Sequence, residues 1–158
     1  MTTWRRYLFS GFLTHVVPVE LEADLLAELR ARGAELRELP DGNDNPATIT
    51  EWGFDRGGSC HLGEPRETVN IDGLTVSIPS RQVSAIRESL RRAMAKARRF
   101  ASGARYVKLK LWVHATVLTP AQASRLLTAL DDLIEPAERR SDLFRAALAR
   151  ELAQGGVS

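Results

Sequence analysis

The segment Thr68-Val69-Asn70-Ile71-Asp72-Gly73-Leu74-Thr75-Val76-Ser77-Ile78 carries the clearest local signal in the chain. Two runs of alternating β-branched residues flank an Asp-Gly pair. A type I′ turn needs positive φ at both central positions, which Asp-Gly accepts, so the segment predicts a two-residue β-hairpin. In this register Ile71 faces Leu74 and Val69 faces Val76. The apolar side chains therefore line one buried face of the hairpin.

A strand and a helix are expected before the hairpin. Residues 7–19 are rich in Phe, Val and Leu and predict one strand. Residues 20–32 repeat leucine at helical spacing, with acids near the start and arginines at the end, and Gly33 stops the predicted helix. Between this helix and the hairpin, residues 34–39 form a short possible strand, residues 40–46 have turn composition, and residues 47–54 alternate as another strand.

Helices and one long strand are expected after the hairpin. Pro79-Ser80 opens a helix that runs to about Phe100, and Ser102-Gly103 ends it. Residues 106–118 alternate as a single strand. The remainder predicts two helices, one started by Thr119-Pro120 and broken at Pro136, and one over residues 138–154 that Gly155-Gly156 terminates.

This order of elements is typical of an α+β fold with a small mixed or antiparallel sheet, helices on one face, and two C-terminal helices. It is compatible with a β-α-β-β-α-β sandwich, and a less regular α+β sheet is the alternative. We expect one domain over residues 1–158, with an α/β core at 1–118 and a helical extension at 119–154. Matches at an offset of 40, such as Leu90 with Leu130, are explained by the shared pattern of a strand running into a helix.

Composition excludes several classes of protein. The 158 residues are 44% hydrophobic and 27% charged with a net charge of +2, which is ordinary for a globular domain. No stretch provides the roughly 18 uncharged apolar residues of a membrane span. Arg5-Arg6 is reminiscent of a twin-arginine export signal, but the following apolar run is interrupted and no cleavage site follows. We therefore expect a cytoplasmic protein without a membrane partner.

Residues with metal or thiol chemistry are few. Cys60 is the single cysteine, which excludes an internal disulfide and a multi-thiolate zinc site. A histidine metal site would need His15, His61 and His114 to converge from distant positions. The sequence accordingly predicts no metal and no cofactor.

The distribution of charge is the most informative functional feature. Between Gly73 and Leu130 the chain has one acid, Glu88, while the rest of the sequence is net negative. A near-neutral total thus conceals a strongly basic central third that can attract polyanions. The basic residues of this stretch number eleven: Arg81, Arg87, Arg91, Arg92, Lys96, Arg98, Arg99, Arg105, Lys108, Lys110 and Arg125.

The basic stretch predicts a nucleic-acid or other polyanion interface on a helix and the strand beside it. Lys108, Lys110, Trp112 and His114 alternate onto one predicted strand face, where cations would neighbour an aromatic ring. Binders of single-stranded nucleic acid combine cations for phosphates with aromatic rings for bases. The predicted contact residues are Arg87, Arg91, Arg92, Arg98 and Arg99 of the helix with Lys108, Lys110 and Trp112 of the strand.

Three alternatives remain open from the sequence. The arginines can solvate the helix or pair with the acidic residues of the 20–44 segment. The chain can be a protein-interaction module that docks an acidic partner, or a homodimer that uses the apolar face of Leu143, Phe144, Leu148 and Leu152. It can also be a small enzyme that uses Cys60 or His114. Because no catalytic motif is present, a non-catalytic binding or regulatory protein is the expectation.

Overall fold

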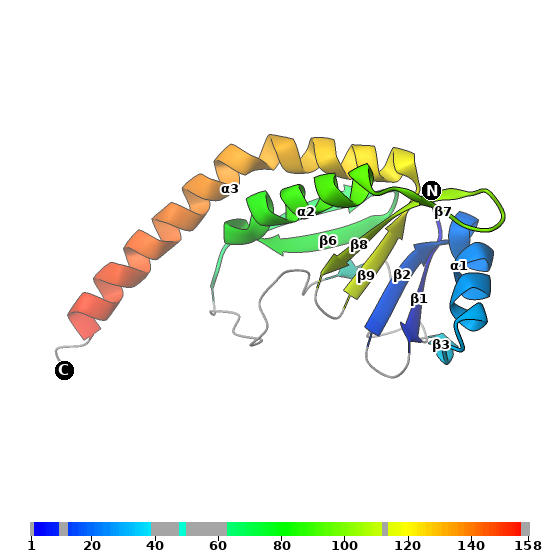
Figure 1. Ribbon diagram of the computed structural model, residues 1–158. Helices are drawn as coiled ribbons and strands as arrows, with labels where there is room; N and C mark the ends of the chain where they lie inside the picture. The colour runs from blue at the N-terminus through cyan, green and yellow to red at the C-terminus, as the bar shows by residue number, and fades with distance from the viewer. Residues whose placement is uncertain (1, 10–12, 39–47, 50–62, 112–113, 156–158) are drawn as a thin grey trace.

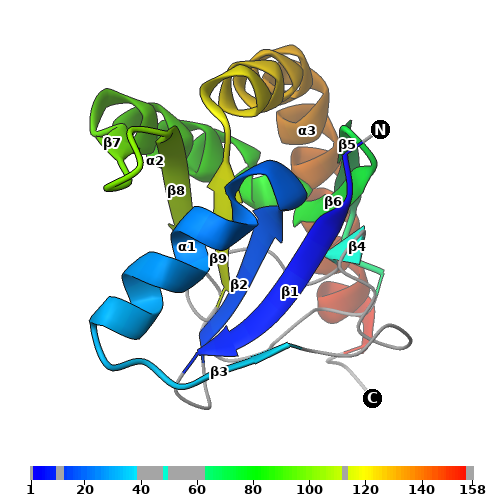
Figure 2. The same cartoon turned by 90° about the vertical axis from the view of Figure 1, so that its right-hand side faces the viewer.

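The computed structural model describes residues 2–9, 13–38, 48–49, 63–111 and 114–155. In these ranges helices accompany mixed, mostly antiparallel sheets, which confirms the α+β prediction (Figures 1 and 2). The elements are β1 (Trp4–Phe9), β2 (Leu13–Pro18), α1 (Val19–Ala31), β3 (Leu36–Glu38), β4 (Thr48–Ile49), β5 (Arg66–Ile71), β6 (Leu74–Pro79), the 3-10 helix η1 (Ser80–Gln82), α2 (Val83–Ala95), β7 (Arg98–Arg99), β8 (Arg105–Leu111), β9 (His114–Leu118) and α3 (Pro120–Gly155).

The described strands form two sheets. Six strands form the larger sheet in the order β3-β1-β2-β9-β8-β7, and three form the smaller sheet in the order β4-β6-β5. Each sheet contains one parallel pair, β2 with β9 and β4 with β6, and the other pairs are antiparallel. The sheets are therefore mixed, in agreement with the predicted class.

Helices cover both faces of the larger sheet, so the prediction of helices on one face is wrong. Along β9, Leu118 belongs to the larger core, formed with α2, α3 and the smaller sheet, whereas the neighbouring Val117 belongs to a second core with α1. Adjacent residues of a strand point to opposite faces. Figure 1 accordingly shows α1 on one side of the sheet and α2 and α3 on the other. The observed β-β-α start also differs from the β-α-β-β-α-β order.

The Asp-Gly hairpin is confirmed with its register. Ile71 pairs with Leu74 and Val69 pairs with Val76, and the apolar side chains of both strands lie in the larger core. Asp72 has φ 48° and Gly73 has φ 92°. These positive angles are the conformation that a type I′ turn requires.

Two single strands predicted from the sequence are each two antiparallel strands. Residues 7–19 contribute to β1 and β2, in which Tyr7 pairs with His15. Residues 106–118 form β8 and β9, in which Leu111 pairs with His114. Residues 106–118 alternate throughout, and Trp112-Val113 is not a turn dipeptide, so the pattern gave no signal for that division. Residues 7–19 do not alternate, and the turn dipeptide Ser10-Gly11 within them is a signal that the single-strand prediction overlooked.

The predicted helix boundaries also change. The helix expected to reach Phe100 ends at Ala95, and Phe100 instead packs in the core beneath α1. The two predicted C-terminal helices are one helix, α3, that continues through Pro136. Figure 1 shows its axis changing direction near the middle. An interior proline costs about 3 kcal/mol, and burial of the next residue, Ala137, in the core helps to offset this cost.

The matches at an offset of 40 correspond to two similar structural units. Each unit is a hairpin followed by a helix, β5-β6-α2 and β8-β9-α3. The described residue pairs nearest the two turns are equivalent: adding 40 to Ile71 and Leu74, which pair in the first unit, gives Leu111 and His114, which pair in the second. The buried helix positions also correspond: Gln82 with Gln122, Val83 with Ala123, Ile86 with Leu126 and Leu90 with Leu130. The two helices pack against each other above the larger core.

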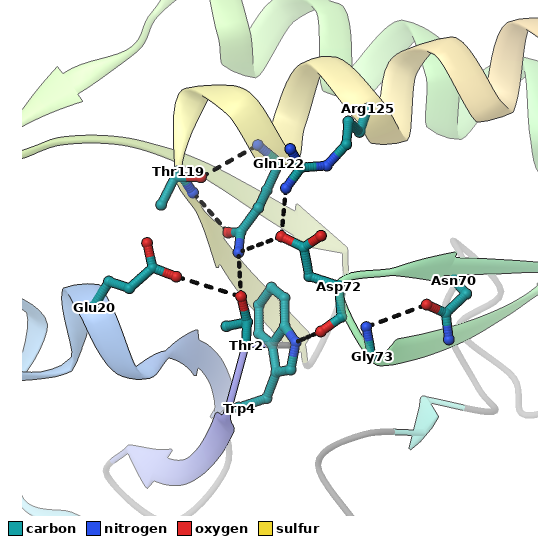
Figure 3. A network of polar contacts seen from close by, with 9 residues as sticks. All are labelled: Thr2, Trp4, Glu20, Asn70, Asp72, Gly73, Thr119, Gln122 and Arg125. Carbon is teal, nitrogen blue, oxygen red and sulfur yellow. Dashed lines mark hydrogen bonds and ion pairs between the residues drawn. The ribbon is translucent and has the colours of Figure 1, made fainter.

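A polar network centred on Asp72 joins the hairpin to two other elements (Figure 3). The indole nitrogen of Trp4 in β1 donates to the Asp72 carbonyl oxygen at 3.1 Å. The carboxylate accepts from Gln122 Nε2 at 3.2 Å and from Arg125, both in α3. Gln122 also exchanges hydrogen bonds with Thr119 at 3.0 and 3.2 Å. This reciprocal pair is a capping box, which confirms the predicted start of α3.

A buried carboxylate fixes the second half of α3. Glu67 in β5 is 4% exposed. It accepts a hydrogen bond from Ser80 at 2.6 Å and two from the Arg140 guanidinium, one of them at 2.8 Å. Burial acts to raise the pKa of the Glu67 carboxyl, but the hydrogen bonds from Arg140 and Ser80 outweigh it, so its pKa lies below the ordinary value.

The Asp72 network predicts unequal effects of two substitutions. Asp72→Ala removes both carboxylate contacts and places alanine at positive φ, so we expect a loss of about 2 kcal/mol in the free energy of unfolding. Asp72→Asn keeps an acceptor oxygen and tolerates positive φ, and should lose less than half as much. Urea unfolding of both variants measures the difference. Equal losses would show that neither the turn conformation nor the acceptor oxygen matters.

Glu67 predicts a pH dependence of stability. Because folding lowers the pKa of this carboxyl, its contribution is complete above the unfolded-state pKa of about 4.3 and is lost as the pH falls through the lower folded-state pKa. At pH 7 we expect Glu67→Gln to unfold about 2 kcal/mol more easily than the wild type. Urea unfolding at a series of pH values should show this gap shrinking in acid. The exposed Glu151→Gln is the control, and a gap independent of pH would contradict the assignment.

Candidate anion-binding site

The basic residues of α2 point in different directions. Arg87 forms an ion pair with Asp131 of α3, so its positive charge is compensated by an acid of the neighbouring helix. Arg92 lies 3.6 Å from Glu88 one turn earlier, and both side chains are largely exposed. Surface pairs of this kind contribute little to stability. At 100° per residue, Arg87 and Arg91 share the flank near α3, whereas Arg92 lies closer to Lys96.

Four cations line a hollow at the end of α2. Its volume is ≈ 270 Å³, and its lining comes from the end of α2 and from the two strands that follow. Among the residues that the structure describes, no acidic side chain lines it. The lining residues are Ala93, Lys96, Arg98, Lys108 and Lys110. We call this hollow, with its four cations Lys96, Arg98, Lys108 and Lys110, the cationic hollow.

Local backbone structure brings these side chains together. Helix α2 ends at Ala95, and the backbone N–H of the capping residue Lys96 still bonds to the Arg92 and Ala93 carbonyls at 3.2 Å. The chain then enters β7, where Arg98 pairs with Tyr106 of β8. Gly103, at φ 93°, lies between the two strands, and its N–H bonds to the Phe100 carbonyl at 2.8 Å. The chain reversal therefore places the helix end beside β8.

Stacked aromatic rings anchor this reversal. Phe100 and Tyr106 stack with ring centroids 3.9 Å apart, and both rings are buried in the core beneath α1. The Tyr106 hydroxyl lies 3.4 Å from the Glu28 carboxylate of α1. Burial raises the pKa of this hydroxyl, and the Glu28 charge adds to the effect. The tyrosine therefore stays protonated and positions β8 against α1.

Lys108 has the most perturbed environment in the cationic hollow. It is half-buried on β8, between the buried Val107 and Leu109. Burial lowers the pKa of its amine, and the charges of Arg32, Lys110 and Arg98 lower it further, while Glu28 acts in the opposite direction. An anion in the hollow would relieve the repulsion among these cations.

Three acids of the α1 region are paired with cations that do not line the hollow. Glu22 lies 3.3 Å from Arg5, and Glu38 lies 3.1 Å from the same arginine. Glu28 pairs with Arg32 at 3.1 Å. Its charge also acts on Lys108. Among the described residues, these contacts leave Lys96 and Lys110 without an ion pair.

The structure brings together part of the predicted interface. Arg98, Lys108 and Lys110 meet in the cationic hollow, and Lys96, which was counted among the basic residues but not selected as a contact, joins them. Its place at the helix C-terminus was the signal that could have selected it.

The other predicted contact residues that the structure describes do not line the hollow. Arg99 is exposed and pairs in register with Arg105, another exposed cation. Arg91 is exposed, Arg92 has the weak surface pair, Arg87 is paired with α3, and Trp112 lies outside the described residues.

His114 does not share a face with the lysines, contrary to the prediction. It pairs with Leu111, whose side chain lies in the larger core, whereas Lys108 and Lys110 alternate with Leu111 and point to the opposite face. His15 is 1% exposed and contacts the Phe9 ring edge-on at 5.6 Å. Cys60 and His61 lie outside the described residues, so a Cys60 enzyme stays untested.

Other features of the described chain are less specific. Two adjoining hollows of ≈ 310 and ≈ 340 Å³ lie beside the second half of α3 and share Arg81, Ser141 and Arg145. Their linings mix acids and bases, which gives no clear preference for a ligand charge. In the described ranges, no group of three His, Cys, Asp or Glu side chains is arranged to hold a metal. The helices of those ranges also include none that could cross a bilayer.

Comparison of the chain with protein-family models, with curated proteins and with solved structures found no match.

Proposed function

We propose that the protein is a non-catalytic binding protein that holds a polyanion, in the first instance single-stranded nucleic acid, through the cationic hollow. The observation that carries the proposal is the convergence of Lys96, Arg98, Lys108 and Lys110 on one concave surface without a lining acid among the described residues. Like charges in proximity repel each other, so such an arrangement is unfavourable unless an anion is bound. A phosphate among these side chains would receive charge-assisted hydrogen bonds.

Neighbouring charges extend the surface beyond the hollow. Arg99 and Arg105 are exposed on the β7–β8 pair, and Arg92 is exposed on α2 one turn before Lys96. Successive phosphates of a strand could therefore contact successive cations. In the described chain, β8 pairs with β7 through Tyr106 and Arg105 only. No described strand pairs with residues 107–111 on that edge, beside the lysines, and a flexible single strand can follow such an edge more easily than a rigid duplex.

A second candidate function has one observation in its favour. Leu143 and Leu152 in the last turns of α3 are 65% and 67% exposed. Figure 1 shows these turns extending beyond the two sheets. Exposed apolar side chains on a projecting helix are common at protein interfaces. A protein-interaction module, homodimeric or with an acidic partner, is therefore the alternative, and the molar mass in solution tests its homodimeric form.

The main proposal predicts salt-dependent binding. We expect labelled single-stranded DNA or RNA to bind in fluorescence anisotropy, with the logarithm of affinity falling linearly with the logarithm of salt concentration. The double variant Lys108→Gln/Lys110→Gln should bind about tenfold more weakly at low salt, and its salt slope should be smaller by about 1 to 2.

A variant with the same net charge provides the control. Arg139→Gln/Arg150→Gln removes two exposed charges of α3 that do not line the hollow, and should bind within about twofold of the wild type. Equal losses in the two double variants would mean that net charge alone attracts the nucleic acid. Absence of wild-type binding at low salt would overturn the proposal.

A further inference from the structure

All three lysines of the chain lie at the cationic hollow. The sequence has 22 Lys and Arg residues, and Lys96, Lys108 and Lys110 are its only lysines. Each of them lines the hollow, next to one arginine. The described ion pairs elsewhere in the chain use arginine, as in Arg87 with Asp131 and Arg140 with Glu67. The hollow therefore differs from the rest of the molecule in the kind of cation, as well as in its charge.

Arginine and lysine side chains differ in the reactivity of their nitrogen atoms. The guanidinium of arginine stays protonated and is a poor nucleophile, whereas the amine of lysine can lose its proton and attack a carbonyl carbon. Anion binding alone would be served by arginine, which forms bidentate contacts with phosphate. Three lysines at one site in an arginine-rich chain thus indicate a role for an amine.

Lys108 is the lysine best placed to react. Its side chain is half-buried on β8, while Lys110 is exposed two residues further along the same face. Burial lowers the pKa of the Lys108 amine, the charge of Glu28 opposes this shift, and the neighbouring cations Arg32, Lys110 and Arg98 add smaller lowering contributions. A lower pKa increases the fraction of free amine near neutral pH, which is the form that attacks a carbonyl. The other cations keep their charge and remain available to hold an anionic group.

We propose that the cationic hollow binds a small phosphorylated aldehyde or ketone and that Lys108 forms an imine with its carbonyl carbon. Lys96, Arg98 and Lys110 would hold the phosphate. The volume of ≈ 270 Å³ is close to the lower end of small-molecule sites, which favours a compact ligand. This inference rests on the anion-binding part of the proposed function and adds a covalent step to it.

The step is balanced without an oxidant or reductant. The free amine of Lys108 attacks the carbonyl carbon, and a proton moves from nitrogen to oxygen to give a carbinolamine. Loss of the hydroxyl group with a second proton from nitrogen releases one water and leaves the carbon–nitrogen double bond. Hydrolysis reverses the sequence, so the bond is reversible, and reduction of the carbon–nitrogen double bond makes it permanent.

Reductive trapping tests the inference. The protein is incubated with pyridoxal 5′-phosphate, a phosphorylated aldehyde used as the probe, then reduced with borohydride, digested and mapped by mass spectrometry. We expect most of the label on Lys108. Lys108→Arg, which keeps the charge, should lower the total label about tenfold, whereas Lys96→Arg and Lys110→Arg should retain the label on Lys108. Pyridoxal without the phosphate should label about tenfold more slowly, and inorganic phosphate should slow the phosphorylated probe.

The possible results separate this inference from the proposed function. Label spread evenly over the three lysines and the N-terminal amine, or unchanged total label in Lys108→Arg, would overturn the imine. Selective labelling of Lys108 without oligonucleotide binding would support the imine and overturn the nucleic-acid proposal. Oligonucleotide binding that persists within about twofold in Lys108→Arg, together with evenly spread label, would support the proposed function and overturn only the imine.

Discussion

The turn at Asp72-Gly73 is the constraint on which much of the architecture depends. Its two positive φ angles fix the register of β5 against β6, and a slip of one residue would expose the apolar face. The same turn receives Trp4 from β1 and Gln122 and Arg125 from α3. Three segments that are far apart in the sequence are thus fixed at one point, where the larger sheet, the smaller sheet and the long helix meet (Figure 3).

The position of the cationic hollow follows from the alternation of β8. Val107, Leu109 and Leu111 face the larger core, so Lys108 and Lys110 must point to the other side of the strand. On that side α1 and the Phe100–Tyr106 stack occupy the area next to Lys108. The stack also holds β7 in place and with it Arg98. Packing forces therefore bring four like charges together, and the charge of Glu28 in α1 offsets part of their repulsion at Lys108.

The sequence was informative where the local signal and the tertiary structure agree. The Asp-Gly hairpin, the first helix and the capped start of α3 were predictable because their turn and cap residues carry a specific chemistry. The division within residues 106–118 was not, because alternation has the same appearance in one long strand and in two paired strands. The division within residues 7–19 was overlooked, although Ser10-Gly11 is a turn dipeptide. Pro136 misled because a proline locally favours the end of a helix, whereas packing of α3 on the core, to which burial of Ala137 contributes, sustains the helix through it.

The site was predictable in part. Clustering of charge in the sequence identified Arg98, Lys108 and Lys110, and the structure places them together. The sequence could not show that Arg87 forms an ion pair with Asp131, 44 positions later. Nor could it show that His114 and the lysines lie on opposite faces of the β8–β9 pair. Both depend on which elements become neighbours. Recognition of the offset of 40 as two similar hairpin units would have predicted the second hairpin, because Leu111 and His114 occupy the positions of Ile71 and Leu74.

The parallel pairing of β2 with β9 has a consequence for synthesis of the protein. Thr14 pairs with His114, 100 positions later in the chain. On the ribosome, β1, β2 and α1 emerge long before β9, so one edge of β2 stays open until most of the chain has been made. Closing so long a loop is slow, and the waiting edge can pair with other chains. The larger sheet is therefore completed late, and chaperones that cover strand edges would raise the yield of folded protein most during that interval.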